Sequence, residues 1–359
     1  MRLLIAGGGT GGHLFPALAI ARAFRSEHPD GKVLFVGVKK GIEARIIPQT
    51  EFSIRFIDSK GMLGKGFFNK IKALFTIPVG LYQSVKIIKD YRPDFVLGVG
   101  GYASGPTLAA ASILGAPTGI QEQNSLMGLT NKLLSRVVNK IFISWENTTP
   151  ATDPLKTLLV GNPIREELLT ALPDNGSDKF KILIFGGSLG ARSINQAMIS
   201  GVHDLRDHKG KISIRHQTGM GAAEEVRKAY TELGIDAEVF EFIDDIGPHY
   251  KWADLVVSRS GASTLAELTA LGKPAILVPY PFAIKDHQLY NAKFLEARGA
   301  ARIVLDSELS SGILVKSIIE LMAQQETLEK MALNSRKLGR PQAARTIARE
   351  ILKLKRKSN

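Results

Sequence analysis

Short apolar runs alternate along the chain with longer stretches in which apolar residues recur at helical spacing. This alternation is typical of parallel β-sheets covered by α-helices, so an α/β fold is predicted. The apolar runs predict buried strands over residues 3–6, 33–36, 95–99 and 141–144 in the first half, and over residues 181–185, 212–215, 255–258 and 275–278 in the second half.

Both halves of the chain open with the same unit. The first strand runs into six residues, GGGTGG at 7–12, and the strand at 181–185 runs into GGSLG at 186–190, each before a helical pattern. The repeated strand, glycine loop and helix predict two Rossmann-like domains that face a central cleft. Residues 159–163 (LVGNP) are the expected linker, and residues 173–178 are an expected surface connection.

The composition narrows the class of protein. The 359 residues include no cysteine, and 44% are hydrophobic and 23% charged. These values are typical of globular proteins, and they exclude disulfide scaffolds, thiolate catalysis and cysteine-ligated metal centres. The first apolar run is too short for a secretory signal, and glycine and proline interrupt the most apolar window near residues 108–114, so no membrane span is expected.

The net charge of +13 is distributed unevenly along the chain. Residues 1–160 carry 19 basic and 10 acidic side chains, residues 161–339 carry 21 and 23, and residues 340–359 carry 7 and 1. The two ends of the chain are therefore basic. This indicates an anionic partner for one part of the protein, such as nucleic acid, an acidic lipid surface or a phosphorylated substrate.

The first glycine loop contains the dinucleotide pattern G-x-G-x-x-G at Gly7, Gly9 and Gly12. In NAD-binding proteins this pattern is accompanied by a carboxylate at the end of the next strand, which binds the ribose. This chain has two lysines there, so NADP is the only dinucleotide that the pattern still allows as a ligand. Otherwise the loop offers backbone N–H groups to a phosphate, or its glycines serve a tight turn only. His13 follows directly, as a general base for an attacking hydroxyl or as a capping and packing residue.

Two further loops of this kind occur in the second half. Residues 186–191, which include Ser188, and residues 258–264 each place hydroxyls and backbone N–H groups at a predicted helix start. Together they are predicted to bind a diphosphate. Glu267 lies three residues after Thr264, so the two residues form a capping box or Glu267 accepts both hydroxyls of a ribose.

Residues 59–89 contain six lysines and no acidic residue. Apolar residues at 67, 71, 74, 75 and 78 share one face of a predicted helix. This basic amphipathic segment predicts an interfacial membrane contact, or alternatively a helix whose apolar face packs on the core beside solvated lysines. No nucleic-acid-binding motif accompanies the charge. The candidate membrane residues are Phe67, Phe68, Lys70, Lys72, Leu74 and Phe75.

These motifs resemble those of the MurG branch of glycosyltransferase family 28. Its bacterial members transfer N-acetylglucosamine from UDP-N-acetylglucosamine (UDP-GlcNAc) to undecaprenyl-diphospho-muramoyl-pentapeptide (lipid I), which gives lipid II. The resemblance extends over nearly the whole chain, and Gln121 departs from it by replacing a histidine. It rests on residues 8–13 (GGTGGH), 100–106 (GGYASGP), 122–124 with 128–131, 161–165 (GNPIR), 186–191 (GGSLGA), 242–245 (FIDD), 259–262 with Glu267, and 286–288 with 291–292.

The resemblance implies a GT-B fold. Residues 1–160 with 340–359 would form the domain that binds the acceptor and an anionic membrane, and residues 161–339 would form the domain that binds UDP-GlcNAc. The first half and the tail, which together carry a charge of +15, would then lie on one domain. The resemblance also implies a peripheral position at the cytoplasmic face of the bacterial cell membrane.

The resemblance also implies roles for individual residues. Thr10, Gly11 and Gly12 would close over the donor or hold the acceptor diphosphate, and His13 is the candidate base. The acceptor would also lie near Gly9, Tyr102 and Ser104. In the donor site, the phosphates would contact Ser188 and Arg165, and uracil would contact the backbone of Ile243. The sugar would contact Gln288 and Asn124. The nucleotide would be lined by Ser263, Thr264, Leu265, Ala266 and Glu267.

In the expected mechanism, the 4-hydroxyl of the acceptor's N-acetylmuramic acid attacks C1 of the donor sugar and inverts it to a β-1,4 link. Loop amides, helix N-termini and Arg165 would stabilise the leaving diphosphate. The sequence contains no D-x-D motif and no histidine cluster, so no metal or other cofactor is expected. Three other functions stay open: a UDP-sugar epimerase of the same fold, a related transferase that acts on diacylglycerol, and a nucleotide-binding module without activity.

Overall fold

The computed structural model describes residues 1–59, 67–170, 178–187 and 189–354, with the backbone alone at residues 67–76 and 311. The chain divides into two compact units. Unit 1 comprises Met1–Arg165 and Pro341–Asn359, and unit 2 comprises Glu166–Arg340. The sequence analysis placed these divisions after residues 160 and 339.

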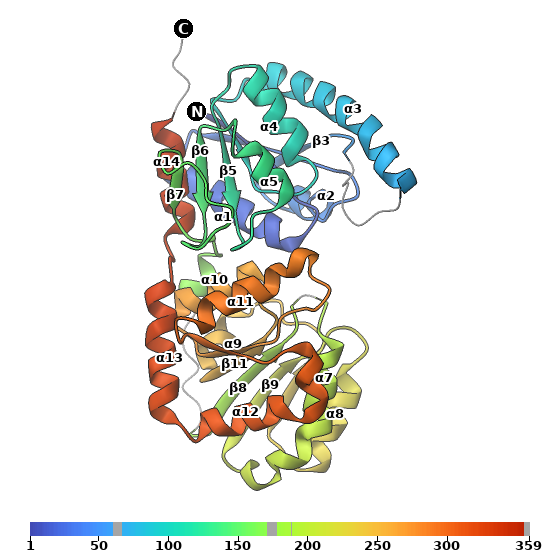
Figure 1. Ribbon diagram of the computed structural model, residues 1–359, viewed down its shortest axis with the longest axis vertical. Helices are drawn as coiled ribbons and strands as arrows, with labels where there is room; N and C mark the ends of the chain where they lie inside the picture. Colours follow the sequence, from blue (N-terminus) through green and yellow to red (C-terminus); the bar gives the residue numbers. More distant parts are fainter. Residues whose placement is uncertain (60–66, 171–177, 188, 355–359) are drawn as a thin grey trace. The chain divides into compact units, whose positions relative to one another are not determined.

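Unit 1 is a parallel sheet between two layers of helices (Figure 1). Across the described residues its strand order is β3-β2-β1-β4-β5-β6-β7. The strands are β1 (Arg2–Ala6), β2 (Lys32–Gly37), β3 (Ser53–Phe56), β4 (Phe95–Gly98), β5 (Thr118–Glu122), β6 (Lys140–Ile143) and β7 (Thr157–Leu159). The helices are α1 (Gly11–Glu27), α2 (Glu43–Ile46), the short 3₁₀ helix η1 (Ile47–Gln49), α3 (Phe67–Tyr91), α4 (Ser104–Ile113), α5 (Leu129–Leu134) and α14 (Ala343–Lys353).

The alternation of side chains along β1 explains the two helical layers. Leu3 and Ile5 belong to a core cluster with residues of α1 and α14, whereas Leu4 and Ala6 belong to a second cluster with residues of α3 and α4. Both faces of the sheet are buried, as expected for parallel strands that read as continuous apolar runs.

The end of the chain returns to unit 1, where α14 packs along α1 (Figure 1). Glu27 in the last turn of α1 forms ion pairs with Arg345 at 3.4 Å and Arg349 at 3.0 Å, both on α14. Ile347 and Ile351 of α14 are completely buried. The basic tail is therefore part of the unit that contains the first half of the chain.

Unit 2 repeats the parallel architecture, with the strand order β10-β9-β8-β11-β12-β13 in its described residues. Its strands are β8 (Phe180–Phe185), β9 (Ile212–Gln217), β10 (Ala237–Phe240), β11 (Leu255–Ser258), β12 (Ala275–Leu277) and β13 (Ala301–Ile303). Its helices are α6 (Glu167–Thr170), α7 (Arg192–Gly201), η2 (Val202–His208), α8 (Ala223–Glu232), α9 (Gly247–Trp252), α10 (Ala262–Leu271), η3 (Ile284–Asp286), α11 (His287–Glu296), η4 (Asp306–Ser311), α12 (Ile313–Met322) and α13 (Gln325–Leu338).

All eight predicted strands are present, and the predicted α/β class with two Rossmann-like domains is confirmed. The sequence analysis missed β3, β5, β7, β10 and β13. Four of these are three- or four-residue strands at or next to a sheet edge, which bury little apolar surface. β5 lies inside the sheet but reads TGIQE, so its polar residues hid a fully buried strand.

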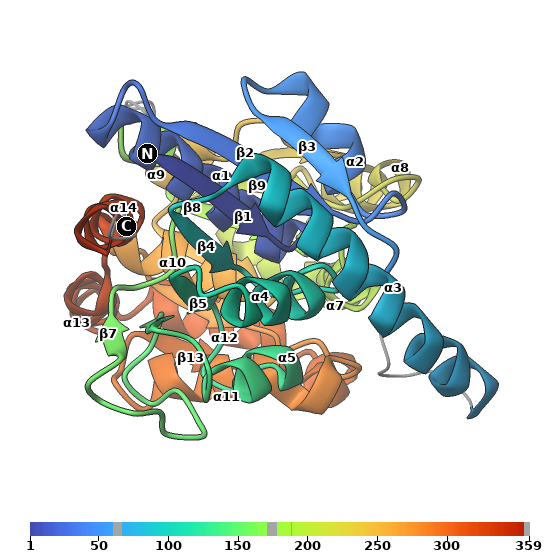
Figure 2. The ribbon, with the colours of Figure 1, turned by 90° about the horizontal axis from the view of Figure 1, so that it is seen from above.

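The basic segment predicted as a helix forms α3, which lies beside α4 (Figure 2). Phe67, Phe68, Lys70, Lys72, Leu74 and Phe75 lie outside the residues whose side chains are described. Further along the same helix, Ile77, Val79 and Tyr82 are exposed. None of the helices in the described ranges combines the length and the hydropathy that crossing a membrane requires.

Candidate functional site

In each unit the strand order reverses direction beside the first strand, between β1 and β4 in unit 1 and between β8 and β11 in unit 2. Ligands of open parallel sheets bind at this switch point, beyond the carboxyl ends of the strands. The glycine loops singled out in the sequence follow β1 and β8. Each unit therefore presents its glycine loop where its fold favours a ligand.

In unit 1 the loop after β1 packs directly on the loop after β4. Gly7 and Gly8 have φ values of 147° and 134°, which favour glycine. The Gly8 N–H donates to the Gly100 carbonyl at 3.3 Å, and a Cβ on Gly101 would lie 2.2 Å from the Gly8 carbonyl oxygen. These glycines therefore serve close backbone packing, which accounts for part of the glycine content of the loop.

The N-terminus of α1 is the exposed part of this region. Thr10 is the N-cap residue, with extended backbone angles and no side-chain capping bond, and both Thr10 and Gly12 are exposed. The first N–H groups of a helix have no partner within the helix and carry the positive end of its dipole. Gly11 and Gly12 contribute such groups without side chains that would block a ligand.

His13 is the third residue of α1, so the predicted position near the helix start is confirmed. Its side chain is half-buried and lies against the loop after β4. A Cβ on Gly100 would come within 2.8 Å of His13 Nε2, so only glycine at this position leaves room for the imidazole. The ring is thus held at the switch point beside the loop amides.

The other predicted acceptor residues differ in exposure. Tyr102 is 50% exposed and follows Gly100, which packs against His13, and Gly101, which packs against Gly8. Ser104 is completely buried at the start of α4, and its Oγ lies 2.4 Å from where a Gly98 Cβ would be. The Ser104 hydroxyl therefore faces the protein interior rather than the surface that carries Tyr102.

A buried carboxylate organises the loop that contains Asn124. Glu122 Oε1 accepts hydrogen bonds from the N–H and the side-chain amide of Asn124, at 3.0 and 3.3 Å. Its Oε2 accepts from the Gly128 N–H at 3.1 Å and from Asn131 Nδ2 at 2.9 Å. Burial raises the pKa of Glu122, and these hydrogen bonds oppose the shift. Glu122 occurs in the motif at residues 122–124 but no role of its own was predicted for it, and its position two residues before Asn124 was the available sequence signal.

Gln121, which departs from the family pattern, is part of a buried polar network. Its Nε2 donates to Asn162 Oδ1 at 3.1 Å and to Ser144 Oγ at 3.4 Å, and its Oε1 accepts from Gln123 Nε2 at 2.5 Å. Gln123 Nε2 also donates to the Val99 carbonyl at 2.8 Å. Gln121 therefore connects β5 with the predicted linker and, through Gln123, with the residue before the glycines at 100 and 101.

Arg165 ends unit 1 rather than beginning the domain in which the sequence analysis placed it. Its guanidinium carbon lies 6.0 Å from the centre of the Phe15 ring, on the first turns of α1. This position places a positive charge near the N-terminal part of α1.

In unit 2, the loop after β8 packs closely on the loop after β9. A Cβ on Gly190, whose φ is 74°, would lie 2.1 Å from the Thr218 carbonyl oxygen. Gln217 Nε2 donates to the Gly187 carbonyl at 2.9 Å. Ser188, the predicted phosphate contact in this loop, lies outside the described residues.

The predicted nucleotide-binding stretch forms the first two turns of α10. Gly261 is the N-cap residue, and Ser263 and Thr264 are partly exposed in the first turn. The side chains of Leu265 and Ala266 are buried in the unit, so they do not face a ligand. The first turn of α10 therefore offers backbone N–H groups and two hydroxyl-bearing residues, and the hydroxyl oxygen of Ser263 is buried.

The capping-box interpretation of Glu267 is wrong. Thr264 is the third residue inside α10 and not its N-cap, so the two residues lack the required positions. Glu267 Oε2 instead accepts a hydrogen bond from the Tyr250 hydroxyl at 2.9 Å. Tyr250 is completely buried on α9, and its hydrogen bond holds the Glu267 carboxylate from the interior of the unit. No local sequence signal marks Tyr250 as this partner.

Two further donor-site residues already make internal hydrogen bonds. The Ile243 N–H donates to Gln217 Oε1 at 3.1 Å, which engages the N–H of the residue predicted to read uracil. Gln288 Oε1 accepts from the Tyr280 N–H at 3.0 Å. The Ile243 carbonyl and the Gln288 amide NH₂ are the groups that these bonds leave for a ligand.

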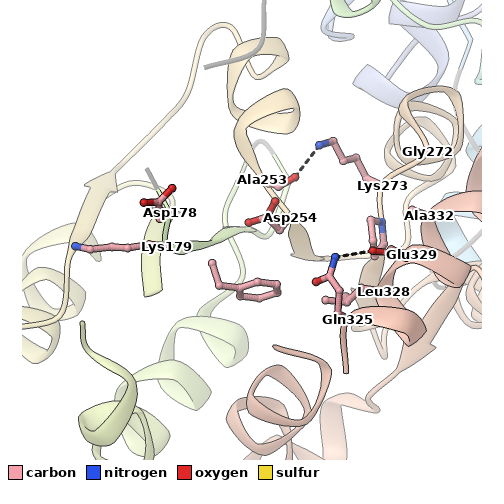
Figure 3. A pocket seen from close by; sticks show the side chains of 12 residues that line it. Asp178, Lys179, Ala253, Asp254, Gly272, Lys273, Gln325, Leu328, Glu329 and Ala332 are labelled. Carbon is pink, nitrogen blue, oxygen red and sulfur yellow. Dashed lines mark hydrogen bonds between the residues drawn. The ribbon is translucent and has the colours of Figure 1, made fainter. Parts of the chain in front are cut away.

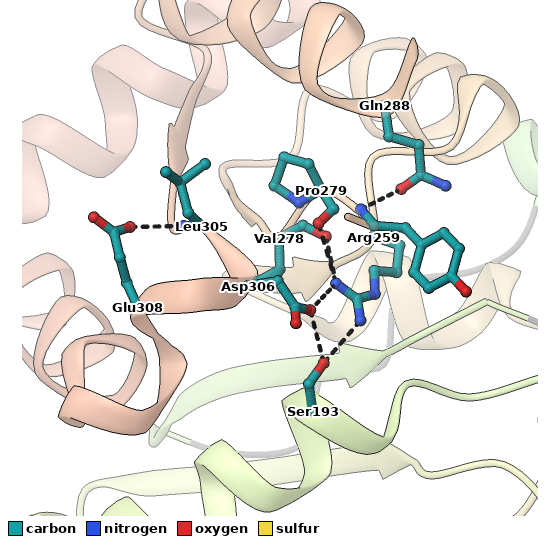
Figure 4. Close-up of polar contacts among 9 residues, drawn as sticks. Ser193, Arg259, Val278, Pro279, Gln288, Leu305, Asp306 and Glu308 are labelled. Carbon is teal, nitrogen blue, oxygen red and sulfur yellow. Dashed lines mark hydrogen bonds and ion pairs between the residues drawn. The ribbon is translucent and has the colours of Figure 1, made fainter. Parts of the chain in front are cut away.

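Arg259 fixes the segment before α10 (Figure 4). Its guanidinium donates to the carbonyls of Val278 and Pro279, both at 3.2 Å, and to Ser193 Oγ at 2.8 Å. It also pairs with Asp306 Oδ2 at 2.5 Å. The segment is thereby connected to the end of β12, the start of α7 and η4. Arg259 occurred in a quoted motif, but only the fold brings its partners together.

A cavity of about 420 Å³ lies at the other end of the unit 2 sheet (Figure 3). Phe180, Asp254 and Pro274, at the amino ends of β8, β11 and β12, line it together with residues of α13. Lys273 donates to the Ala253 carbonyl at 2.7 Å, and burial lowers its pKa to about 8. The glycine loops and α10 do not contribute to this cavity.

Among the described residues, no three histidine, aspartate or glutamate side chains gather as a set of metal ligands. The groups brought together at the two switch points are backbone amides, hydroxyls, one imidazole in unit 1 and one carboxylate in unit 2. Backbone amides at helix N-termini bind phosphate, and a carboxylate binds a diol.

Both halves of the chain match one protein family. Residues 3–143 match the model of the glycosyltransferase family 28 N-terminal domain, and residues 181–347 match that of its C-terminal domain. A relative from Geobacter sulfurreducens is 46% identical over 99% of this chain and 100% of its own length. It is named UDP-N-acetylglucosamine–N-acetylmuramyl-(pentapeptide) pyrophosphoryl-undecaprenol N-acetylglucosamine transferase.

Solved structures show the same fold. The crystal structure of Acinetobacter baumannii MurG has a TM-score of 0.82 and 30% identity, and the match covers 98% of this chain and 99% of that one. The UDP-GlcNAc 2-epimerase of Neisseria meningitidis, bound to UDP-GlcNAc, has a TM-score of 0.65 and 17% identity over 98% and 100% of the two chains. The epimerase comparison supports the fold alone. The chain belongs to glycosyltransferase family 28.

Proposed function

We propose that this protein transfers N-acetylglucosamine from UDP-GlcNAc to the 4-hydroxyl of N-acetylmuramic acid in undecaprenyl-diphospho-muramoyl-pentapeptide. The observation that carries the proposal is the 46% identity, over 99% of the chain, to a transferase named for this donor and acceptor. The product would be lipid II, an intermediate of peptidoglycan synthesis.

Unit 2 holds the donor in this proposal. The first-turn amides of α10, with Ser263 and Thr264, bind the diphosphate, and Glu267 accepts the ribose hydroxyls. The Ile243 carbonyl reads uracil, since its N–H already donates to Gln217. Gln288 donates its amide NH₂ to the sugar. By family resemblance, Ser188 and Arg165 add contacts to the phosphates and Asn124 adds one to the sugar.

Unit 1 holds the acceptor and supplies the base. The amides of Gly11 and Gly12 and the Thr10 hydroxyl bind the acceptor diphosphate at the N-terminus of α1, with Tyr102 beside them. His13 takes the proton of the 4-hydroxyl as its oxygen attacks C1 of the donor sugar. The bond between C1 and the β-phosphate oxygen breaks, and UDP leaves with the electron pair. Attack opposite the leaving group inverts C1 and gives a β-1,4 link.

Release of UDP from UDP-GlcNAc by the purified protein tests this reaction. UDP should form only when a short-chain lipid I analogue is present, whereas equal release without an acceptor, with an epimerised free sugar, would indicate the epimerase. His13→Ala should lower kcat by about 100-fold or more and leave the Kd for UDP unchanged. The matched control is His203→Ala, because His203 is exposed on η2 of unit 2 and lies outside the glycine loops.

We further propose that unit 1 binds the cytoplasmic face of the cell membrane as a peripheral protein. Unit 1 carries 26 basic and 11 acidic residues, whereas unit 2 carries 21 and 23. On α3, Val79 and Tyr82 are 46% and 72% exposed, and Ile113 on the adjacent α4 is 71% exposed. Lys86 and Lys89 are exposed on the same helix α3. Apolar groups beside lysines match the interface of an anionic bilayer.

Sedimentation with lipid vesicles tests this surface. The protein should sediment with phosphatidylglycerol-containing vesicles and much less with phosphatidylcholine alone, because the lysines need anionic headgroups. The double variant Tyr82→Ser, Ile113→Ser should bind several-fold less. Leu155→Ser is the matched control, because Leu155 is 88% exposed on unit 1 but lies on the β6–β7 connection. Equal binding to both vesicle types would contradict the proposal.

A further inference from the structure

Glu43, the first residue of α2, is a buried carboxylate that the sequence analysis did not single out. It is 1% exposed, and each carboxylate oxygen accepts one backbone N–H. Oε2 accepts from Gly9 at 2.6 Å, and Oε1 accepts from Val38 at 2.9 Å. Gly9 follows β1 and Val38 follows β2, so this one side chain connects the loops after two adjacent strands.

Glycines enclose this carboxylate on several sides. A Cβ on Gly8, whose φ is 134°, would lie 2.4 Å from Glu43 Cδ. A Cβ on Gly37 would lie 2.5 Å from Glu43 Cγ, and one on Gly41 would lie 2.2 Å from a carboxylate oxygen. Three glycines therefore leave room for Glu43. Of these, only Gly8 belongs to the loop at residues 7–12, whose glycines were predicted to bind a phosphate or to serve a tight turn.

Because of the contact with Glu43, the backbone N–H groups of the glycine loop serve two purposes: one holds the loop, and those at the start of α1 are available to a ligand. The Gly9 N–H is engaged by Glu43, so this amide is not free for a ligand in the described structure. The amides at the start of α1 lie directly after it in the chain. A run of glycines is conformationally permissive, so the direction of Thr10, Gly11 and Gly12 depends on what holds Gly7–Gly9 in place.

We propose that Glu43 is a positioning residue for the acceptor-binding loop of unit 1. Its carboxylate fixes the loop after β1 through the Gly9 N–H and thereby presents the amides of Gly11 and Gly12 to the acceptor diphosphate. The role in binding the acceptor rests on the proposed function, whereas the hold on the loop does not. Glu43 itself touches no substrate.

Two variants remove both or one of the two oxygen contacts. Glu43→Ala removes both acceptors, whereas Glu43→Gln keeps one acceptor and turns an NH₂ group toward the other backbone N–H. Glu51→Gln is the matched control, because Glu51 is a half-exposed carboxylate of the same unit and pairs with Arg22 at the surface. The Kd for UDP, a ligand assigned to unit 2, reports whether the rest of the protein is intact.

Hydrogen exchange of the peptide that contains residues 7–12 measures the hold on the loop without any activity. We expect exchange about 10-fold faster in Glu43→Ala, an intermediate rate in Glu43→Gln and the wild-type rate in Glu51→Gln. With a lipid I analogue, the KM for the acceptor should rise about 10-fold in Glu43→Ala and less in Glu43→Gln, with the KM for UDP-GlcNAc and the Kd for UDP unchanged.

Unchanged exchange in both Glu43 variants would overturn the proposal, as would an unchanged acceptor KM in an active enzyme. A parallel rise in both KM values and in the Kd for UDP would also overturn it, because that pattern indicates general destabilisation. If the wild-type protein does not transfer sugar at all, the proposed function fails, and the exchange measurement still decides whether Glu43 holds the loop. Glu43→Gln keeps the test open if Glu43→Ala does not fold.

Discussion

Replacing Gly100 by alanine tests whether the position of His13 controls the reaction. The Cβ of Gly100→Ala would lie 2.8 Å from His13 Nε2 and 2.9 Å from Cδ2, whereas ordinary contacts begin at 3.4 Å. The imidazole is the end of a side chain, so it moves more easily than the backbone. The methyl group should displace the ring by about 0.6 Å, the difference between these distances.

The size of the effect follows from this displacement. A misplacement of about 1 Å costs roughly 100-fold in rate, so about 0.6 Å predicts a loss in kcat of roughly 10- to 30-fold. This corresponds to about 1.4–2 kcal/mol in the activation free energy. The φ of 91° at Gly100 is also unfavourable for alanine and should lower the stability of unit 1 by about 1–3 kcal/mol.

Gly115→Ala is the control that separates strain from displacement. Gly115 also has a positive φ, 68°, but a Cβ there has no atom within 4 Å. This variant should lose about 1 kcal/mol of stability and keep its kcat. Both variants are measured by steady-state transfer to a lipid I analogue, by urea unfolding and by titration with UDP. Wild-type kcat in Gly100→Ala, or equal losses in the two variants, would refute the assignment of His13 as the base.

Three further predictions concern unit 2. Tyr250→Phe removes the hydroxyl that donates to Glu267 at 2.9 Å and should weaken UDP binding by about 1 kcal/mol in calorimetry, and an unchanged Kd would exclude the ribose role of Glu267. Arg259→Lys cannot reach all four partners of the guanidinium, so urea unfolding should show a loss of about 2–3 kcal/mol, and wild-type stability would show that the network contributes little. Burial lowers the pKa of Lys273 from 10.5 to about 8. Between these pH values the folded protein therefore binds fewer protons than the unfolded chain. The contribution of Lys273 to the free energy of unfolding rises with pH over this range. The melting temperature of the wild type should therefore rise relative to that of Lys273→Met as the pH increases from 8 to 10.5. A difference that stays constant over this range would contradict the lowered pKa.

The sheet architecture could be predicted because its central strands are continuous apolar runs. β1 and β8 are buried on both faces, so their sequences carry a strong signal. β5 carried none, since Gln121 and Glu122 are polar and their burial depends on hydrogen-bond partners elsewhere in the chain. A pattern of apolar residues cannot report a strand that is stabilised by a polar network.

The candidate site could be predicted only in part, for a related reason. The glycine loops and His13 are local in sequence, and the structure places them at the switch points. Glu43 lies 34 residues from Gly9, and Tyr250 lies 17 residues from Glu267, so the fold alone brings these pairs together. The capping-box interpretation of Glu267 failed because the helix begins at Ala262, two residues before Thr264.

The transfer itself is the central claim, and following the sugar tests it most directly. UDP-GlcNAc labelled in the sugar is incubated with the purified protein and a short-chain lipid I analogue, and the lipid is extracted. The account predicts that the label enters the lipid fraction as a β-1,4-linked disaccharide, in proportion to the UDP released. Label that stays in the water-soluble fraction while UDP accumulates would contradict it.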